Sequence, residues 1–366
     1  MDCPYIRETD VGEWGLGLLK RLGTGRYPLS GSMELTERCN LSCIHCLINQ
    51  PAGSQSAASR ELRLDQIREI LDQVVDAGCL FMLLTGGEPL LRPDFSEIYH
   101  HATRKGLLVT LFTNGTLVTP GIADLLAEYR PQAVEISLYG YTQATYEHVT
   151  HVPGSHARCM SAIELLLERR VPLSLKTVVL RANCHEIEES RAFARERGLT
   201  FRTDSLIWPR LDGERHPLTQ RLAPSEIVAT ERLDLVGEQE RRMIQAALDA
   251  APLRAGPVYN CGAGERGFHI NSVGHLSMCL MSRSPAFDLT RGSFLEGWNG
   301  PLSESRRKQR ALATRCETCR AGTLCQQCTA WSQASHGDDE TPDDFVCQVG
   351  QLRQAKWQAT NLYEHG

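Results

Sequence analysis

Three cysteines, Cys39, Cys43 and Cys46, are spaced CxxxCxxC near the start of the chain. Cysteine thiolates are the usual ligands of iron–sulfur clusters, and a tight loop of this spacing lets three sulfurs converge on one face of a cubane cluster. Three protein ligands leave one iron open to a bidentate small molecule. A fragment of a zinc site is the alternative, although zinc usually takes paired CxxC or CxxH spacings and a fourth ligand. His45 is expected to pack beside the loop or support it rather than to bind metal.

A second motif decides between these interpretations. Gly86, Gly87, Glu88 and Pro89 follow the triplet by one predicted strand–helix–strand unit. Two glycines at a strand end let the backbone approach a ligand closely, and the acid can pair with an ammonium group. The combination favours a cluster that binds a small amino-group ligand.

The C-terminal part of the chain carries a second group of thiols. Its members are Cys261, Cys279, Cys316, Cys319, Cys325, Cys328 and Cys347. Seven cysteines are too many for one tetrahedral site and enough for two four-iron clusters with one position vacant. The paired CxxC units at 316–319 and 325–328 would also fit a zinc ribbon, which stays the alternative.

The remaining cysteines, Cys3, Cys79, Cys159 and Cys184, are scattered and are expected to pack as small hydrophobes. A disulfide framework is not expected, because the chain is large and its first residues lack the apolar segment of a secretory signal.

No apolar run approaches the roughly 18 residues that span a bilayer. We therefore expect a cytoplasmic protein. Its formal net charge of −5 gives no support for nucleic acid or an anionic membrane as a partner.

Short, nearly continuous apolar runs alternate with helical patterns between residues 32 and 207, as in strands buried on both faces of a parallel sheet. The predicted strands cover 32–35, 81–84, 108–112, 134–138, 173–180 and 201–207. Helices are predicted over 64–75, after Pro120 as far as Tyr129, and over 162–167. The fold expected is α/β, a partial (β/α)6 TIM-like barrel followed by a small cysteine-rich, metal-stabilised domain.

In such barrels the chemistry sits where the strands end. The triplet, Glu88, Thr113 with Asn114, and Ser137 each follow or end one of the first four predicted strands. The predicted division is a lead segment over 1–31, the barrel over 32–207, a helical bridge over 208–260, the cysteine-rich domain over 261–350 and a tail over 351–366.

These motifs make the chain resemble the radical S-adenosylmethionine (SAM) enzymes. The resemblance implies that Cys39, Cys43 and Cys46 hold a four-iron cluster whose open iron is chelated by the methionyl amine and carboxylate of SAM. It assigns contacts with SAM to Gly86, Gly87, Glu88 and Pro89, and further contacts to Thr113, Asn114 and Ser137. Reductive cleavage of SAM would give a deoxyadenosyl radical that takes a hydrogen atom from the substrate.

The C-terminal cysteines resemble the SPASM extension of these enzymes, which carries two auxiliary four-iron clusters, so three clusters are expected in all. The family pattern implies that Cys261, Cys279 and Cys328 hold the nearer cluster. It places Cys316, Cys319, Cys325 and Cys347 on the farther one. The gap between Cys325 and Cys328 is two residues, where the family often has three, which leaves this partition open.

The resemblance also implies the substrate class and partners. SPASM-type enzymes most often crosslink or oxidise ribosomally made peptides or protein side chains, and relatives act on tetrapyrroles or aminocyclitols. A separate peptide-recognition protein and a flavodoxin or ferredoxin reductant are the expected partners. An electron-transfer or scaffold protein that has lost SAM cleavage is the alternative from another class, although the intact Gly86–Pro89 motif argues against it.

Overall fold

The computed structural model describes residues 25–48, 50–231, 238–249, 256–321 and 324–363, together with residues 17, 18, 21 and 23. One curved sheet of nine strands organises these residues, in the order β11-β10-β9-β1-β4-β5-β6-β7-β8. The strands are β1 (Ser30–Glu34), β4 (Phe81–Thr85), β5 (Leu108–Thr113), β6 (Ala133–Ser137), β7 (Leu173–Val178), β8 (Phe201–Asp204), β9 (Gly267–Ile270), β10 (His275–Ser277) and β11 (Phe287–Asp288). The six strands from β1 to β8 are all parallel, which confirms the partial barrel.

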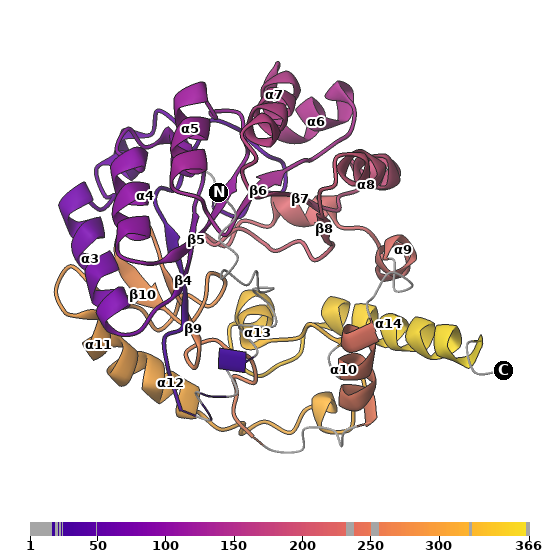
Figure 1. Ribbon diagram of the computed structural model, residues 1–366. Helices are drawn as coiled ribbons and strands as arrows, with labels where there is room; N and C mark the ends of the chain where they lie inside the picture. The colour runs from indigo at the N-terminus through magenta and orange to yellow at the C-terminus, as the bar shows by residue number, and fades with distance from the viewer. Residues whose placement is uncertain are drawn as a thin grey trace.

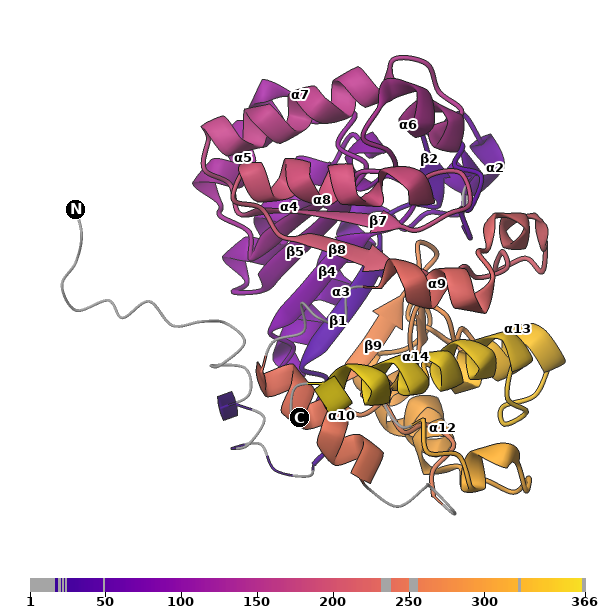
Figure 2. The same ribbon diagram turned by 90° about the vertical axis from the view of Figure 1, so that its right-hand side faces the viewer.

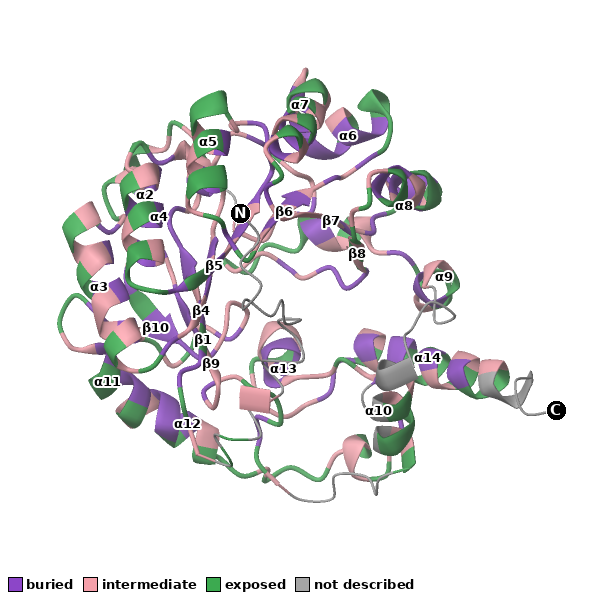
Figure 3. Ribbon diagram, in the orientation of Figure 1, coloured by how far each residue is buried: buried purple, intermediate pink, exposed green. Residues whose placement is uncertain are grey.

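Helices cover the outer face of the curved sheet (Figures 1 and 2). They are α3 (Leu64–Asp76), α4 (Phe95–Arg104), α5 (Pro120–Glu128), α6 (Gln143–Thr150), α7 (Ser155–Glu168) and α8 (Ile187–Glu196). The apolar side chains of α3, Ile67, Ile70, Leu71 and Val74, are all buried, as their helical spacing predicts. The main hydrophobic core lies between these helices and the sheet, and it appears as the buried layer in Figure 3.

Two predicted strands are shorter than their apolar runs. The prediction over 173–180 ends at Val178 and the one over 201–207 ends at Asp204. Leu180, Leu206 and Ile207 are buried all the same, because they pack into two smaller apolar clusters beyond the strand ends. Their hydrophobicity therefore reflects loop packing and not strand pairing.

The bridge contains α9 (Pro224–Thr230) and α10 (Glu238–Asp249), between which residues 232–237 lie outside the described part of the chain. Shorter helical turns are η1 (Pro89–Leu91), η2 (Cys184–Glu186) and η3 (His216–Gln220). A small parallel pair, β2 (Arg38–Cys39) and β3 (Gln50–Pro51), precedes helix α2 (Gln55–Ala58).

The cysteine-rich segment has more regular structure than its composition indicates. It contributes β9 to β11, of which β9 pairs in parallel with β1 and so extends the barrel sheet. It also forms α11 (Phe294–Gly297), η5 (Trp298–Leu302), α12 (Ser303–Arg307), η6 (Arg315–Glu317), α13 (Thr329–His336) and α14 (Asp344–Tyr363). The predicted boundary at residue 350 falls inside α14, so the chain does not break there.

This segment contacts both edges of the barrel. At one edge β9 pairs with β1, and at the other Trp331 of α13 stacks on Trp208 with ring centroids 3.5 Å apart. Val346 and Val349 of α14 pack into the same apolar cluster as Ile227 of α9. The cysteine-rich segment therefore faces the concave side of the sheet and closes the gap between its edges (Figure 1). Among the residues described, no helix is long and apolar enough to cross a membrane.

Candidate functional site

The cysteine triplet lies on a closed loop at the end of β1. Cys39 ends β2, and the chain returns to pair Cys39 with Pro51 of β3. Inside the loop the Cys46 amide donates a 3.1 Å hydrogen bond to the Cys43 carbonyl. The Ser42 amide donates to the carbonyl of Thr150, at the end of α6, over 2.9 Å. The loop is thus fixed both to itself and to the barrel.

Burial and the charges of neighbouring thiols act on Cys39 and Cys43. Burial first, and then the Glu88 carboxylate and Cys46, raise the pKa of Cys39 to about 12. Burial also raises the pKa of Cys43 well above its usual range, with added effects from Cys46 and Cys39. The three sulfurs are therefore close neighbours in a site of low dielectric constant. Such thiols ionise readily only against a positive charge, which iron supplies.

The glycine motif is held against the segment that leads into the triplet. The Gly87 amide donates to the Thr36 carbonyl over 2.7 Å, and the Glu88 amide donates to the Arg38 carbonyl over 2.9 Å. A Cβ on Gly87 would lie 2.2 Å from the Arg38 oxygen, and Gly86 has a φ of +132°. Only glycine fits this approach. The close backbone approach predicted from the sequence is therefore made to the chain before Cys39.

Glu88 is completely buried and accepts three hydrogen bonds. Its Oε1 accepts from the Thr113 hydroxyl over 2.7 Å and from the Leu90 amide over 3.1 Å, and its Oε2 accepts from the Asn114 amide over 2.7 Å. Burial raises its pKa to about 7, although these hydrogen bonds lower it. A carboxylate oxygen pair accepts about four hydrogen bonds, so capacity remains for an ammonium donor. Pro89 is the first residue of η1, directly after this acid.

Asn114 joins the acid to the triplet. Its side-chain amide lies 3.7 Å from the Cys39 sulfur and donates to Asn40 over 3.0 Å. Its Oδ1 accepts from the Thr116 amide and hydroxyl over 2.9 and 2.6 Å. The structure thus brings the predicted residues Thr113 and Asn114 together with Glu88 and Cys39.

Ser137 lies on the other side of the triplet. It hydrogen-bonds to Tyr139, and the three cysteines raise the pKa of that buried tyrosine after burial itself. His45 packs edge-on against Tyr139 with ring centroids 4.7 Å apart, and burial lowers the pKa of the imidazole to about 4. His45 therefore packs against Tyr139 beside the loop.

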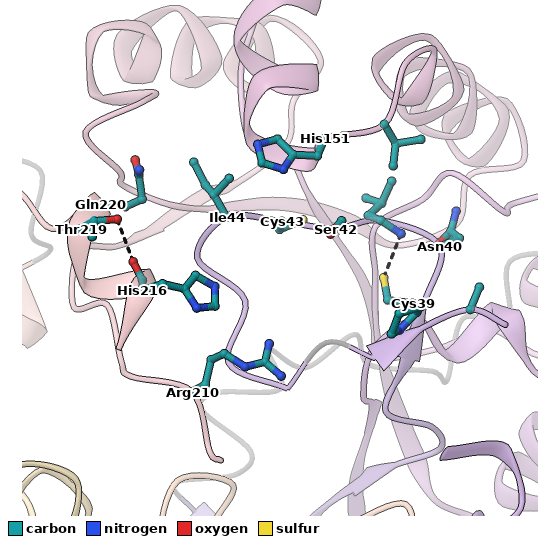
Figure 4. Close-up of a pocket in the computed structure, with 14 residues that line it drawn as sticks. Cys39, Asn40, Ser42, Cys43, Ile44, His151, Arg210, His216, Thr219 and Gln220 are labelled. Carbon is teal, nitrogen blue, oxygen red and sulfur yellow. Dashed lines mark hydrogen bonds between the residues drawn. The ribbon is translucent and has the colours of Figure 1, made fainter. Parts of the chain in front are cut away.

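A cavity of 650 Å³ opens beside the triplet loop. Figure 4 shows Arg210 and His216 reaching in from the bridge, opposite Cys39 and Cys43. The Leu211 amide donates to the Leu47 carbonyl over 3.0 Å, so the bridge packs directly on the cluster loop. The position of His216 could not be anticipated from its sequence neighbours.

The C-terminal cysteines fall into two spatial sets. In the first, burial raises the pKa of Cys328, and Cys279 and Cys261 raise it further. In the second, Cys325 shares a side-chain hydrogen bond with Cys347 and interacts electrostatically with Cys319 and Cys316. These are the sets that the family pattern implies. Cys79 and Cys159 lie in the main core and Cys184 packs at the edge of a smaller cluster, whereas Cys3 lies outside the described residues.

Within the described ranges, no three His, Cys, Asp or Glu side chains are placed to hold a single metal ion. The donors that do gather are thiols in sets of three and four, which is the ligand chemistry of iron–sulfur clusters. The triplet, with Glu88 and its spare acceptor capacity nearby, fits a cluster with an open iron and an amino-group ligand.

Two further ionisable side chains lie on β7 and in the bridge. Lys176 on β7 lies over the ring of Phe112, and desolvation lowers its pKa well below the usual range. Asp212 forms a 3.0 Å ion pair with Arg210 and is half exposed. Sequence reasoning missed two buried polar residues on the concave face, Glu34 and His269, because their proximity depends on β9 joining β1.

Comparison with known proteins agrees with this geometry. Residues 33–194 match the radical SAM superfamily. The AdoMet-dependent heme synthase of Methanosarcina barkeri is 28% identical over 325 residues, covering 83% of this chain and 92% of that protein. The mycofactocin maturase MftC of Mycobacterium ulcerans is 30% identical over 304 residues, covering 80% of each.

Among solved structures, SuiB of Streptococcus suis bound to the precursor peptide SuiA has the same fold. The TM-score is 0.64 at 16% sequence identity, over 95% of this chain and 84% of SuiB.

Proposed function

Because the chain belongs to the radical SAM superfamily, we propose that it crosslinks or oxidises a side chain of a ribosomally made peptide or protein. As an enzyme of this superfamily it binds a 4Fe–4S cluster and SAM. The observation that carries the proposal is the contact network from Cys39 through Asn114 to Glu88, since it ties the thiols and the acid into one site. When bound, the cluster and SAM supply an electron and a deoxyadenosyl radical.

The side chains of this site have separate tasks. Cys39, Cys43 and Cys46 hold the cluster, and Glu88 accepts the methionyl ammonium of SAM. Thr113 and Asn114 orient that carboxylate, as their 2.7 Å hydrogen bonds support. Gly86, Gly87 and Pro89 form the adjoining wall, and Ser137 adds a hydroxyl on the opposite side.

Two auxiliary four-iron clusters complete the proposed cofactor set. Cys261, Cys279 and Cys328 hold one cluster, and Cys316, Cys319, Cys325 and Cys347 hold the other. The mutual charge effects within each set support this partition. The first set has three cysteines, so its remaining position is available to substrate or to another ligand. Iron, zinc and sulfide analysis tests the assignment: three clusters require about twelve irons per chain, and two zincs would contradict it.

Two kinds of similar protein support different substrates. A peptide substrate is favoured by the maturase relative and by the SuiB fold, which is seen with a bound precursor peptide. A tetrapyrrole is the second candidate, because the heme synthase aligns over most of both chains. We also propose a flavodoxin or ferredoxin as the reductant, a separate peptide-recognition partner and a cytoplasmic location, where thiols stay reduced.

The test is anaerobic reconstitution with iron, sulfide and SAM under a low-potential reductant. Formation of 5′-deoxyadenosine establishes SAM cleavage, and Cys43→Ala is the inactive control. Short peptides encoded beside the gene and a tetrapyrrole are then compared as substrates by mass spectrometry. If fully loaded protein forms no deoxyadenosine, the electron-transfer or scaffold alternative replaces this proposal.

A further inference from the structure

Three polar residues meet on the concave face of the sheet, where β1 and β9 pair. Gly31 and Met33 of β1 and Phe268 of β9 face the hydrophobic core. Because side chains alternate along a strand, Ser32, Glu34 and His269 point to the opposite, concave face. Ser32 and His269 are also direct partners in the strand register.

Ser32, which is partly exposed, contacts the buried His269, and His269 in turn lies beside the buried Glu34. Ser32 Oγ, on a partly exposed residue, lies 2.9 Å from His269 Nδ1. His269 Nε2 lies 3.8 Å from Glu34 Oε1, too far for a direct hydrogen bond. His269 is 0% and Glu34 is 1% exposed, and both Nε2 and Glu34 Oε2 lack a hydrogen-bond partner. Two enclosed polar atoms without partners cost free energy, and a functional role is one explanation for such atoms in a folded protein.

The arrangement favours one tautomer of the imidazole. The carboxylate of Glu34 faces Nε2 and so favours a proton on that nitrogen. Nδ1 is then an acceptor for the Ser32 hydroxyl, which lies farther, 3.5 Å, from the Phe268 carbonyl oxygen. A second proton on the ring would give an imidazolium held beside Glu34.

The surrounding charges keep Glu34 ionised. Burial alone would raise its pKa, but His269 and Arg283 lower it. Arg283 donates to Glu34 Oε1 over 2.5 Å, and Glu37 is the further acid that interacts with both. A buried carboxylate that remains charged can stabilise a neighbouring imidazolium.

The three residues also lie between the two proposed cofactor regions. Glu34 pairs in register with Thr85, the residue before Gly86. Its ion-pair partner Arg283 follows Ser282, whose amide donates to the Cys279 sulfur over 3.2 Å. This face therefore adjoins both proposed cofactor regions.

We propose that Ser32, His269 and Glu34 form a proton-accepting relay for an O–H, N–H or S–H group of the substrate. The relay rests on the proposed function. The substrate proton moves to Ser32 Oγ as the serine proton moves to His269 Nδ1, and the electron pair stays on the substrate heteroatom and forms its new bond to carbon. SAM, when bound, would supply the deoxyadenosyl radical that takes the C–H hydrogen atom, and an oxidised iron–sulfur cluster would accept one further electron, so the substrate would be oxidised by two electrons.

The first test needs no substrate, because it measures which ring nitrogen of His269 carries a proton. Reconstituted enzyme with ¹⁵N-labelled histidine is examined by NMR, and His269→Asn identifies the His269 signal. The expected result is an unprotonated Nδ1 and a protonated Nε2, with a shift of the Nδ1 signal in Ser32→Ala. No shift is expected in Ser30→Ala, a serine two residues earlier on the same face. A proton on Nδ1 in the resting enzyme would overturn the relay.

The second test uses the peptide or tetrapyrrole that the wild type modifies. In Ser32→Ala the ratio of product to deoxyadenosine should fall about 100-fold, the lower range for a lost acid–base group. Ser32→Thr restores the hydroxyl and should restore the ratio, and Ser30→Ala should leave it unchanged. An unchanged ratio in Ser32→Ala overturns the relay. Absence of deoxyadenosine in the wild type would instead contradict the proposed function, whatever the NMR result.

Discussion

The side-chain amide of Asn114 lies 3.7 Å from the sulfur of Cys39, on the same residue whose backbone amide donates to Glu88. One residue at the end of β5 therefore contacts both the first cysteine of the triplet and the buried acid. Hydrogen bonds to cysteine sulfur are among the factors that set the reduction potential of an iron–sulfur cluster.

Asn114→Ala should make the potential of the SAM-binding cluster more negative, because the N–H donor to Cys39 is lost. It should also cost about 1–3 kcal/mol of stability, since the partly buried Asn40 and the buried Thr116 lose their hydrogen bonds to Asn114. Potentiometric titration followed by EPR measures the first effect and chemical denaturation the second. Thr116→Val is the control: it removes a partner of Asn114 but leaves the donor to Cys39, so it should lower stability alone. An equal shift of potential in both variants would contradict this role.

Glu88 should make the stability of the metal-free protein depend on pH. Burial raises its pKa from 4.5 to about 7, so between these values the folded state holds a proton that the unfolded state has released. The free energy of unfolding should therefore fall by about 3 kcal/mol as the pH rises through this window, and level off above it.

Glu88→Gln, which cannot ionise, should lack this fall, whereas Glu97→Gln on the exposed side of α4 should retain it. Urea denaturation of the three proteins at several pH values measures the difference. Parallel curves for wild type and Glu88→Gln would show that the carboxyl group is ionised throughout.

Glu61 contacts two arginines, one of which, Arg38, directly precedes Cys39 of the triplet. It accepts hydrogen bonds from Arg38 over 2.7 and 2.9 Å, and Arg92 lies 3.6 Å away. Glu61→Gln should cost about 1–3 kcal/mol, because it leaves the partly buried guanidinium of Arg38 without its counter-charge, whereas Arg92 keeps Asp94. The loop that begins at Cys39 should then load less iron, as measured by iron content after reconstitution. Asp65→Asn is the matched control, since its ion pair with Arg63 is exposed and contributes little.

The sequence predicted the barrel strands well because each is a short apolar run between turn residues. Phe81 and Leu108 begin strands at the predicted residue, and Thr113 and Ser137 stand at the ends of theirs. Parallel strands place such end residues at one edge of the sheet, so their proximity to the triplet followed from topology. Leu206 and Ile207 misled the prediction because apolar loops under a second layer have the same composition as buried strands.

Contacts between the barrel and the cysteine-rich segment could not be predicted in the same way. Ser32 and His269 are 237 residues apart, and nothing in the short run around His269 indicates that β9 pairs with β1. The pairing is favoured by the packing of Phe268 against Gly31. This contact forms only when the barrel and the cysteine-rich segment are both folded. Long-range pairing of this kind leaves no local pattern.

The two spatial sets of C-terminal cysteines predict how much iron double cysteine variants lose compared with single variants. Cys279→Ala should remove about four irons per chain, and so should Cys316→Ala, because each thiol belongs to a different proposed cluster. Cys279→Ala with Cys328→Ala should lose no more than either alone, since both lie in one set. Cys279→Ala with Cys316→Ala should lose about eight irons. Iron and sulfide analysis with Mössbauer spectroscopy measures the loss. Cys184→Ala, a partly buried cysteine outside both sets, should lose none. If the within-set pair lost as much iron as the cross-set pair, the partition of the seven cysteines would be wrong.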